Sequence, residues 1–395
     1  MSVRHNGTAL AVMQAPITAV EIGKLGQSSL TTAPPVLFRD LEQMVSSLLE
    51  RVGAEFRANP NSAGPAMFEL QSELRCVKQK TSPEVWQDIA ALCLAHPVSR
   101  IFHEDPFTGH CFRKPRGYAG DAELLDYLYG ISDAPSATSP IGRSIFHHMM
   151  EQQGALSVRS RGKILAQVID ETADTRPSPR ILSIACGHLR EGHHSKALAE
   201  GRIGEFIAFD QDADSLAHVS RAFAGKGVKT VSGSVKSILG EKMWFEGFDL
   251  VYAAGLYDYL SERVAIRLTR MMFDMLAPGG RLLVANFAPT LPEVGYMETF
   301  MDWKLIYRTA EEMARLSSDI PGDEWKSNRL FWDEPENIVF LDVVKRAKVK
   351  PIMEFRGAGR KFNVPGRQFF RGQNRLSATR RTALGAPDNP AAELS

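Results

Sequence analysis

Side chains that could do chemistry follow short apolar runs in the middle of the chain. The run ILSIA (181–185) leads into Cys186 and Gly187, and the run FIAFD (206–210) ends in Asp210. A glycine permits a tight turn and a close approach of a ligand to the backbone, and a carboxylate can accept hydrogen bonds from both hydroxyls of a ribose. In an open parallel sheet, ligands bind beyond the carboxyl ends of the strands. The pattern therefore predicts a site for a ligand that contains a ribose.

A parallel sheet is needed to bring these residues together, and the sequence predicts one. Further apolar runs, most of them separated by helical stretches, are VKTVSG (228–233), FDLVYAA (248–254), RLLVANF (281–287) and NIVFLDVVKR (337–346). Short apolar runs that alternate with helices indicate a parallel sheet covered on both faces. Ser234 follows the third run, and Tyr257 and Asp258 come shortly after the fourth, so these residues join the predicted site.

The order of these features resembles the class I S-adenosylmethionine-dependent methyltransferases over about residues 178–346. LAPGGRLLVANF (276–287), in which a helix end turns directly into a strand, is the most specific piece. The resemblance implies an α/β fold with a Rossmann-like sheet, mostly parallel with an antiparallel last strand, and helices on both faces. It also implies S-adenosyl-L-methionine as the cofactor. The loop after the first strand would hold the methionine end, the acid that ends the second strand the ribose, and the loop after the third strand the adenine.

The first of these loops departs from the family pattern. Ser183 stands where an acid usually opens the motif, and Ala185 replaces the first glycine, so Arg190 and Glu191 are the local candidates to hold the amine and carboxylate of the cofactor. The alternative is a structural ion pair. The run lacks the three glycines that seat a pyrophosphate, which argues against a nicotinamide enzyme. The predicted cofactor-binding residues are Ala185, Cys186, Gly187, Arg190, Glu191, Asp210, Gln211, Ser234, Val235, Ala254, Gly255 and Tyr118.

A narrower resemblance covers about residues 100–346 and rests on SIACGHLREG, AFDQDADSL, AAGLYDYL, KPRGYAGDAELLDYLYG and GYMETFMDWKLIYRTAEEM. These segments look like the bacterial methyltransferases of 3-hydroxypalmitic acid methyl ester biosynthesis. That resemblance implies O-methylation of a (3-hydroxy) fatty acid carboxylate. Three alternatives stay open: a small-molecule N-methyltransferase, an RNA methyltransferase that uses a basic tail, and a non-catalytic regulator that binds the cofactor.

The acceptor chemistry decides which side chains are needed. A carboxylate is already ionised at neutral pH, whereas an ammonium or hydroxyl must lose a proton. A carboxylate acceptor instead needs a cation or amide donors to orient it. We predict Tyr257 and Asp258 at the transfer site, and we expect Glu298, Asp302 and Tyr307 to lie along one face of a helix beside it. The predicted substrate-binding residues are Arg113, Arg116, Glu298, Asp302, Tyr307 and Arg308.

The segment FRKPRGYAGDAELLDYLYG (112–130) begins as a loop, because a helix would not tolerate Pro115, Gly117 and Gly120 at this spacing. Its cations and Tyr118 suit a cofactor carboxylate or an anionic substrate. We therefore predict a lid that is formed by Arg113, Arg116, Tyr118 and Asp121. The alternative is a plain helix cap by Asp121 with surface cations around it.

The whole chain divides into four predicted parts. A flexible arm (1–35) precedes an α-helical lid domain (36–173), and the proline-containing DTRPSPR (174–180) leads into the methyltransferase domain (178–346). A basic tail (347–395) follows and is expected to be flexible. The tail has 12 Lys or Arg from Lys345 onward against three acids, with phenylalanines interleaved, which is a pattern that could bind RNA.

Composition restricts the setting. The chain has 395 residues, 44% hydrophobic and 24% charged, and its 47 cations nearly balance 46 anions, which argues against a chain-wide nucleic-acid or membrane field. The four cysteines lack a CxxC spacing, and no leader or long apolar run is evident, so we expect a cytoplasmic protein without membrane insertion. His188, His193 and His194 are wrongly spaced for three ligands on one helical face, so no metal is predicted. The expected partner is a small-molecule substrate, without stable nucleic acid.

Overall fold

The computed structural model describes residues 35–347. The predictions for the N-terminal arm and for the basic tail concern residues outside this range. The first part of the described chain consists of helices that we call the helical part. Its members are α1 (Pro35–Ala58), α2 (Gly64–Lys80), α3 (Pro83–Ala95), α4 (Ser99–Phe102), α5 (Pro106–Arg113), α6 (Ala122–Leu128) and α7 (Pro140–Met150).

Apolar runs form the strands of a seven-stranded sheet, in the order β3-β2-β1-β4-β5-β7-β6. Strands β1 to β5 are parallel, and β7 pairs antiparallel with both β5 and β6. This mostly parallel sheet with an antiparallel last strand confirms the predicted fold class. The strands are β1 (Arg180–Ile184), β2 (Glu205–Asp210), β3 (Val228–Ser232), β4 (Phe248–Ala254), β5 (Leu276–Phe287), β6 (Trp325–Trp332) and β7 (Ile338–Lys345).

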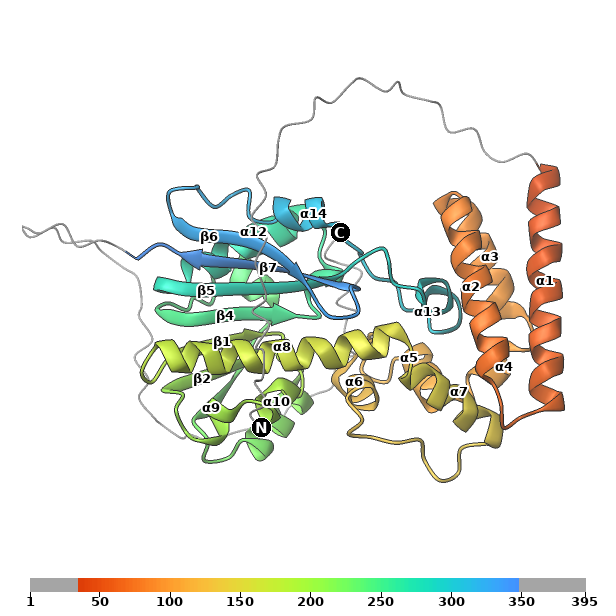
Figure 1. Ribbon diagram of the computed structural model, residues 1–395, viewed down its shortest axis with the longest axis horizontal. Coiled ribbons are helices and arrows are strands. Elements are labelled where there is room, and N and C mark those ends of the chain that lie inside the picture. The colour runs from red at the N-terminus through yellow and green to blue at the C-terminus, as the bar shows by residue number, and fades with distance from the viewer. Residues whose placement is uncertain (1–34, 348–395) are drawn as a thin grey trace, which may run out of the picture.

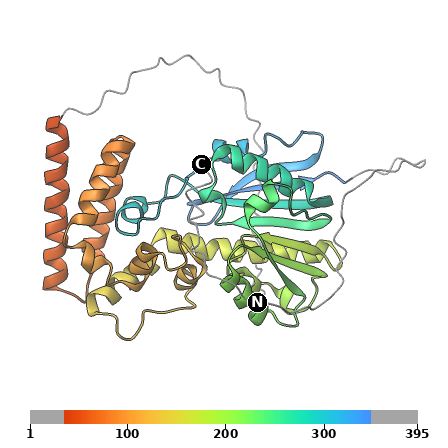
Figure 2. The ribbon, with the colours of Figure 1, turned by 180° about the vertical axis from the view of Figure 1, so that it is seen from behind.

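Helices cover both faces of the sheet. Successive strand residues point to opposite sides, and both sets are apolar, so each face needs a cover. Ile181 and Tyr252 belong to the core beneath α8 and α10, whereas Leu182 and Val251 belong to the core beneath α11, α12 and α14. Figures 1 and 2 show α8 in front of the sheet in one view and α12 in front in the other. The remaining helices are α8 (Gln153–Thr175), η1 (Arg190–His193), α9 (Lys196–Ala199), α10 (Ala213–Ala222), α11 (Val235–Leu239), η2 (Tyr257–Tyr259), α12 (Glu262–Asp274), α13 (Val294–Phe300) and α14 (Ala310–Arg315).

Two helices, α8 and α13, pack against both the helical part and the sheet. Helix α8 extends from the helical part along the sheet, and α13, which follows β5, packs between the sheet and helices α2 and α3 (Figure 1). In α13, Glu298 accepts hydrogen bonds from Lys78 Nζ at 2.6 Å and from Trp86 Nε1 at 2.7 Å. The core beneath α8 is therefore continuous with the core of the helical part.

Two features of the sheet differ from the sequence-based expectation. Strand β6 was not predicted, because WKSNRLFW lies on the sheet edge and only some of its side chains are apolar. The LAPGG segment does not precede β5 but forms its first residues, with a shift in register against β4 between Phe248 and Leu250. Gly279 has a φ of 78°, a value that a glycine adopts without strain. Within residues 35–347, no helix combines the length and the apolar character that a membrane crossing requires.

Candidate functional site

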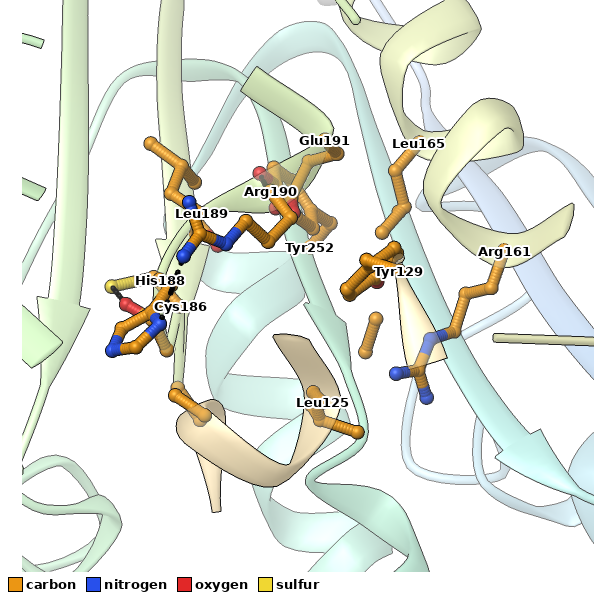
Figure 3. A pocket seen from close by; sticks show the side chains of 15 residues that line it. Leu125, Tyr129, Arg161, Leu165, Cys186, His188, Leu189, Arg190, Glu191 and Tyr252 are labelled. Atoms are coloured by element: carbon orange, nitrogen blue, oxygen red, sulfur yellow. Dashed lines mark hydrogen bonds between the residues drawn. The ribbon is translucent and has the colours of Figure 1, made fainter. Parts of the chain in front are cut away.

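A cavity lies at the carboxyl ends of β1 and β4, under helices α6 and α8 (Figure 3). This is the edge of the sheet where ligands bind in open parallel folds. We call it the β1 cavity. Its lining consists of Ala122, Leu125, Tyr129, Arg161, Leu165, Ser183, Ala185, Cys186, Gly187, His188, Leu189, Arg190, Glu191, Tyr252 and Ala254.

The loop after β1 has an unusual backbone. Ala185, Gly187 and Leu189 all have positive φ, at 55°, 51° and 51°. For a residue with a side chain this conformation costs about 1–2 kcal/mol, and such strain is concentrated at functional sites. The loop brings the Gly187 N–H within 2.8 Å of Asp210 Oδ2, and the Asp212 N–H binds Oδ1 at 2.9 Å.

Asp210 is therefore held rigidly at the end of β2. Its side chain is 8% exposed, and burial raises the pKa of its carboxyl group. Each carboxylate oxygen has two acceptor positions, so the two backbone donors leave capacity for further hydroxyl donors. Asp210 does not itself line the β1 cavity, but it fixes Gly187, which does.

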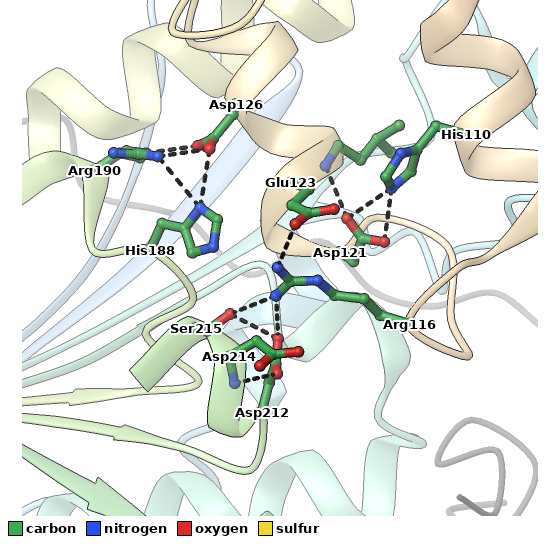
Figure 4. A network of polar contacts seen from close by, with 11 residues as sticks. His110, Arg116, Asp121, Glu123, Asp126, His188, Arg190, Asp212, Asp214 and Ser215 are labelled. Carbon is green, nitrogen blue, oxygen red and sulfur yellow. Dashed lines mark hydrogen bonds and ion pairs between the residues drawn. The ribbon is translucent and has the colours of Figure 1, made fainter. Parts of the chain in front are cut away.

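Arg190 forms the ion pair that was one of its two predicted roles. Its Nε and Nη2 bind Asp126 of α6 at 2.6 and 2.5 Å, and His188 Nδ1 lies 3.0 Å from the same carboxylate (Figure 4). His188 also stacks on His218, with ring centroids 4.2 Å apart. The guanidinium of Arg190 thus ties the loop after β1 to the helical part, and only part of its donor capacity is left for a ligand.

Two other ionisable residues line the β1 cavity from different elements, Glu191 from η1 and Arg161 from α8. Tyr252 Oη donates to Glu191 Oε1 at 2.6 Å, and burial raises the pKa of Glu191. Arg161 projects from α8 toward Tyr129 (Figure 3). Arg161 is 4% exposed, and its Nε has no hydrogen-bond partner within residues 35–347. The sequence-based prediction did not include Arg161.

A signal for Arg161 exists in the sequence. It lies three residues after Val158 and four before Leu165, so helical periodicity places all three on one face. Both apolar residues are buried. An arginine on a buried helical face is rare unless it meets an anion.

The loop that carries the predicted lid residues Arg113, Arg116, Tyr118 and Asp121 packs against the same edge of the sheet. Arg116 Nη1 binds Asp212 Oδ2 at 2.5 Å and Ser215 Oγ at 3.1 Å, and its Nη2 binds Glu123 at 2.8 Å (Figure 4). Burial raises the pKa of Tyr118, and the charges of Asp210 and Asp212 raise it further, so this hydroxyl lies near the end of β2.

The end of this loop fits tightly. A Cβ at Gly120, whose φ is 74°, would lie 2.7 Å from both Trp303 and Tyr259 Oη. Asp121 caps α6 by accepting from Leu124 N–H at 2.8 Å, as the alternative interpretation expected. The remaining lid cation, Arg113, is exposed.

A second cavity lies beside the β1 cavity, and α6 and α8 line both. Val158 and Leu128 line the second cavity, one helical turn or less from Arg161 and Tyr129. Its lining is almost entirely apolar: Phe107, Leu128, Met149, Gln152, Gly154, Ala155, Val158, Phe287, Leu291, Glu293, Met297, Met301 and Trp303. We call it the apolar cavity.

Asp258 interacts with one lining residue of each cavity, Phe287 and Arg161. Its Oδ1 accepts from the N–H of Phe287, which lines the apolar cavity, at 2.7 Å. Burial raises the pKa of Asp258 to about 6, and the charge of Arg161, which lines the β1 cavity, opposes this rise. Asp258 is thus a buried carboxyl group that lines neither cavity but binds the backbone of Phe287 in one and interacts with the charge of Arg161 in the other.

Other predicted residues lie elsewhere. The ring of Tyr257 packs on the α12 side of the sheet, where its hydroxyl lies 2.9 Å from Thr269 Oγ1, because the turn of η2 directs it away from both cavities. Arg308 is buried and donates to Tyr257 O, to Asn286 Oδ1 and to Leu260 O. It braces the backbone after β4 rather than facing a cavity.

The predicted polar stripe on one helix is wrong, because α13 ends at Phe300. Glu298 points to Lys78 and Trp86 of the helical part. Asp302, beyond the helix, has a φ of 44° and pairs with Lys114 at 2.5 Å. Tyr307 has a buried hydroxyl without a partner in the described residues, and the nearest charges include those of Glu298 and Asp258.

The remaining predicted cofactor residues lie at the carboxyl edge. Ser234 caps α11 by accepting from Ser237 N–H at 3.3 Å, and Val235 is the first residue of that helix. Gln211 is exposed between Asp210 and α10. Cys186 and Ala254 line the β1 cavity, and Gly255 follows β4 with a φ of 85°. No group of three or more metal-ligating side chains occurs in the described range.

Comparisons with known proteins give likenesses in structure alone. No protein-family model and no curated protein matches the chain. A Bordetella parapertussis protein described as a possible exported protein is 17% identical, with 77% of this chain and 97% of that chain covered and a TM-score of 0.51. The N-methyltransferase NodS from Bradyrhizobium japonicum is 14% identical, with 48% and 96% covered and a TM-score of 0.35. Magnesium protoporphyrin IX methyltransferase from Synechocystis PCC 6803, with bound SAH, is 8% identical, with 55% and 91% covered and a TM-score of 0.39. The chain thus shares its fold with the Bordetella protein.

Proposed function

We propose that the protein is an S-adenosylmethionine-dependent methyltransferase that acts on a small molecule. The observation that carries this proposal is the carboxyl edge of the sheet. There a buried acid that ends β2 is bound by the N–H of the glycine in the loop after β1, beside a cavity lined by that loop. The free cysteines and the resemblance to bacterial enzymes support a bacterial, cytoplasmic setting.

The residues at this edge fit the parts of the cofactor. Asp210 would accept the ribose hydroxyls, with Tyr118 of the lid beside it, and Ser234 and Val235 would border the adenine. Glu191 would receive the ammonium group, because it is a buried acid on the wall of the β1 cavity. When bound, the cofactor would supply a methyl group on a sulfonium: an aligned nucleophile bonds to the methyl carbon while the C–S bond breaks and the neutral thioether leaves.

The acceptor that the structure favours is a hydroxyl or an amine. Asp258 is a buried carboxyl group behind the wall of the apolar cavity, where it binds the Phe287 N–H, and in its ionised form it would remove the proton that such an acceptor must lose. Three cations that could orient a carboxylate acceptor are engaged elsewhere: Arg116 with Asp212, Lys114 with Asp302, and Arg308 with backbone carbonyls.

A second candidate is methyl ester formation on a (3-hydroxy) fatty acid carboxylate. The apolar cavity favours it, because its lining could receive the first carbons of an acyl chain next to the transfer site. The two candidates differ in their need for a base. A carboxylate acceptor is ionised at neutral pH and does not require Asp258.

The pH dependence of turnover should follow the ionisation of Asp258. Burial raises the pKa of Asp258 to about 6, and a general base works only when deprotonated. We therefore expect kcat to rise about tenfold per pH unit below pH 6 and to level off above it. Initial rates between pH 5 and 8 at saturating cofactor would measure this, and a flat profile would favour the carboxylate acceptor.

The lid makes a separate prediction. Arg116→Met should weaken S-adenosylmethionine binding by about fivefold, because the loop loses about 1 kcal/mol of contacts to Asp212 and Glu123. Isothermal titration calorimetry gives the affinity. Arg51→Met, which removes an ion pair to Glu69 in the helical part, is the control and should leave the affinity unchanged. An unchanged affinity in Arg116→Met would mean that the loop has a structural role and does not contribute to cofactor binding.

Two experiments test the proposed function itself. Calorimetry with S-adenosylmethionine must show binding by the wild-type protein, and its absence would refute the proposal. Incubation with a methyl-labelled cofactor and a bacterial metabolite extract, followed by mass identification of the labelled product, would name the acceptor. Label found in total RNA instead, and lost when residues 350–395 are deleted, would support the RNA methyltransferase.

A further inference from the structure

We infer that Arg161 of α8 binds the carboxylate of the methionine part of the cofactor. This inference rests on the proposed function and adds a residue outside the sheet to the cofactor site. It concerns the end of the cofactor for which the loop after β1 lacks the usual acid and the first glycine, since Ser183 and Ala185 stand at those positions.

The first argument is the burial of an incompletely paired cation. Arg161 is 4% exposed and lines the β1 cavity, and its Nε has no hydrogen-bond partner in the part of the chain that the structure describes. A guanidinium keeps its charge in proteins, and burying a charge costs several kcal/mol unless an anion compensates it. Glu191 and Asp258 lie within electrostatic range of Arg161, but no acid of the described residues forms an ion pair with it, so an anionic group of a ligand in the cavity would complete its pairing.

The second argument is the position of the guanidinium. A Cβ placed at Gly255, directly after β4, would lie 3.4 Å from Arg161 Nη1. The side chain therefore spans from α8 to the carboxyl end of the sheet, where its fork can meet a planar carboxylate in two parallel hydrogen bonds.

The third argument is that Arg161 and Glu191 form a complementary pair for a zwitterion. Glu191 lines the same cavity, and the charge of Arg161 acts on its pKa, so the two groups lie within electrostatic range. A methionine end carries an ammonium and a carboxylate on one carbon. The acid and the guanidinium of the cavity can each meet the group of opposite charge.

The fourth argument concerns the competing cation. Arg190 lines the cavity as well, but its Nε and Nη2 already bind the two oxygens of Asp126. A bidentate pair of this kind satisfies the fork of a guanidinium. Arg161 has no comparable pair among the described residues, so the structure assigns the carboxylate to Arg161.

The test compares two ligands that differ by one group. Calorimetry would measure the affinity of wild type, Arg161→Met and Arg161→Lys for S-adenosylmethionine and for its decarboxylated form, which lacks only the carboxylate. Arg161→Met should weaken S-adenosylmethionine binding by about 10- to 100-fold and change the affinity for the decarboxylated form by less than about threefold. Arg161→Lys should fall between, because it keeps the charge and loses the fork.

Lys163→Met is the matched control, because Lys163 is an exposed cation two residues further along α8, and it should leave both affinities unchanged. If Arg161→Met weakened the binding of both ligands equally, or of neither, the inference about Arg161 would be wrong, while the proposed function would stand. A wild-type protein that binds both ligands equally would also overturn it, and this holds even if Arg161→Met does not fold. A wild-type protein that binds neither ligand would overturn the proposed function and this inference together.

Discussion

Replacement of Asp258 by asparagine should lower kcat by about 100-fold while S-adenosylmethionine affinity stays within about twofold. General base catalysis by a positioned carboxylate contributes about 10²- to 10⁴-fold, and an amide cannot take the proton. The fold should tolerate the change, because an amide oxygen can still accept the Phe287 N–H that now binds Oδ1 at 2.7 Å. Steady-state rates with the identified acceptor, together with calorimetry, would measure both effects.

Asp105→Asn is the control for neutralising a buried acid. Burial also raises the pKa of Asp105 to about 6, but this side chain caps α5 through Phe107 N–H and Thr108 N–H. It should lower stability and leave kcat close to that of wild type. An Asp258→Asn protein with undiminished kcat would remove the base from the mechanism and favour the carboxylate acceptor.

Asp210→Asn should weaken S-adenosylmethionine binding by about 100-fold. The ribose hydroxyls lose a charged acceptor, which is worth about 1.5–3 kcal/mol. An asparagine also cannot accept from both the Gly187 and the Asp212 N–H groups, because one of its two terminal atoms is a donor. The loop after β1, which has positive φ angles, would therefore lose one of the hydrogen bonds that hold it to the end of β2. Calorimetry would report the affinity, and thermal unfolding would show whether the loop change spreads.

Asp214→Asn provides the comparison for this effect. Asp214 is an exposed acid four residues further along, in the first turn of α10, and its backbone N–H binds Asp212. Its replacement should leave the affinity unchanged. Equal binding by the Asp210→Asn protein and the wild type would contradict the cofactor assignment.

The sequence predicts the positions that follow strands, because apolar runs locate strand ends. Asp210 ends β2 and Asp258 follows β4, and both prove to be buried carboxyl groups at the carboxyl edge. Tyr257 was predicted beside Asp258 but points to α12. The period of two that orients side chains within a strand no longer holds in the turn that follows it, so its direction could not be derived.

Partners that lie far apart in sequence could not be predicted. Arg190 meets Asp126 and Arg116 meets Asp212, so cations that looked free for a ligand are engaged across the fold. Glu298 was placed on a stripe with Asp302 because their spacing suits a helix, but the helix ends between them. Arg161 was missed because an arginine in an amphipathic helix is usually solvated, and only the sheet packed beneath α8 makes this one buried.

Because α8 and α13 pack against both the helical part and the sheet, the helical part cannot easily move away from the sheet. Helix α8 lines both cavities while it continues from the helical part, and α13 is anchored to α2 and α3 through Glu298. A hinge that swung the helical part away as a rigid body would have to extract both helices from their cores, at the cost of much buried apolar surface. Smaller segments would then have to move for ligand exchange, and in the predicted lid loop the cations Lys114 and Arg116 are held by ion pairs. Such contacts weaken with ionic strength, so salt should act on the rate of ligand exchange more than on the integrity of the fold.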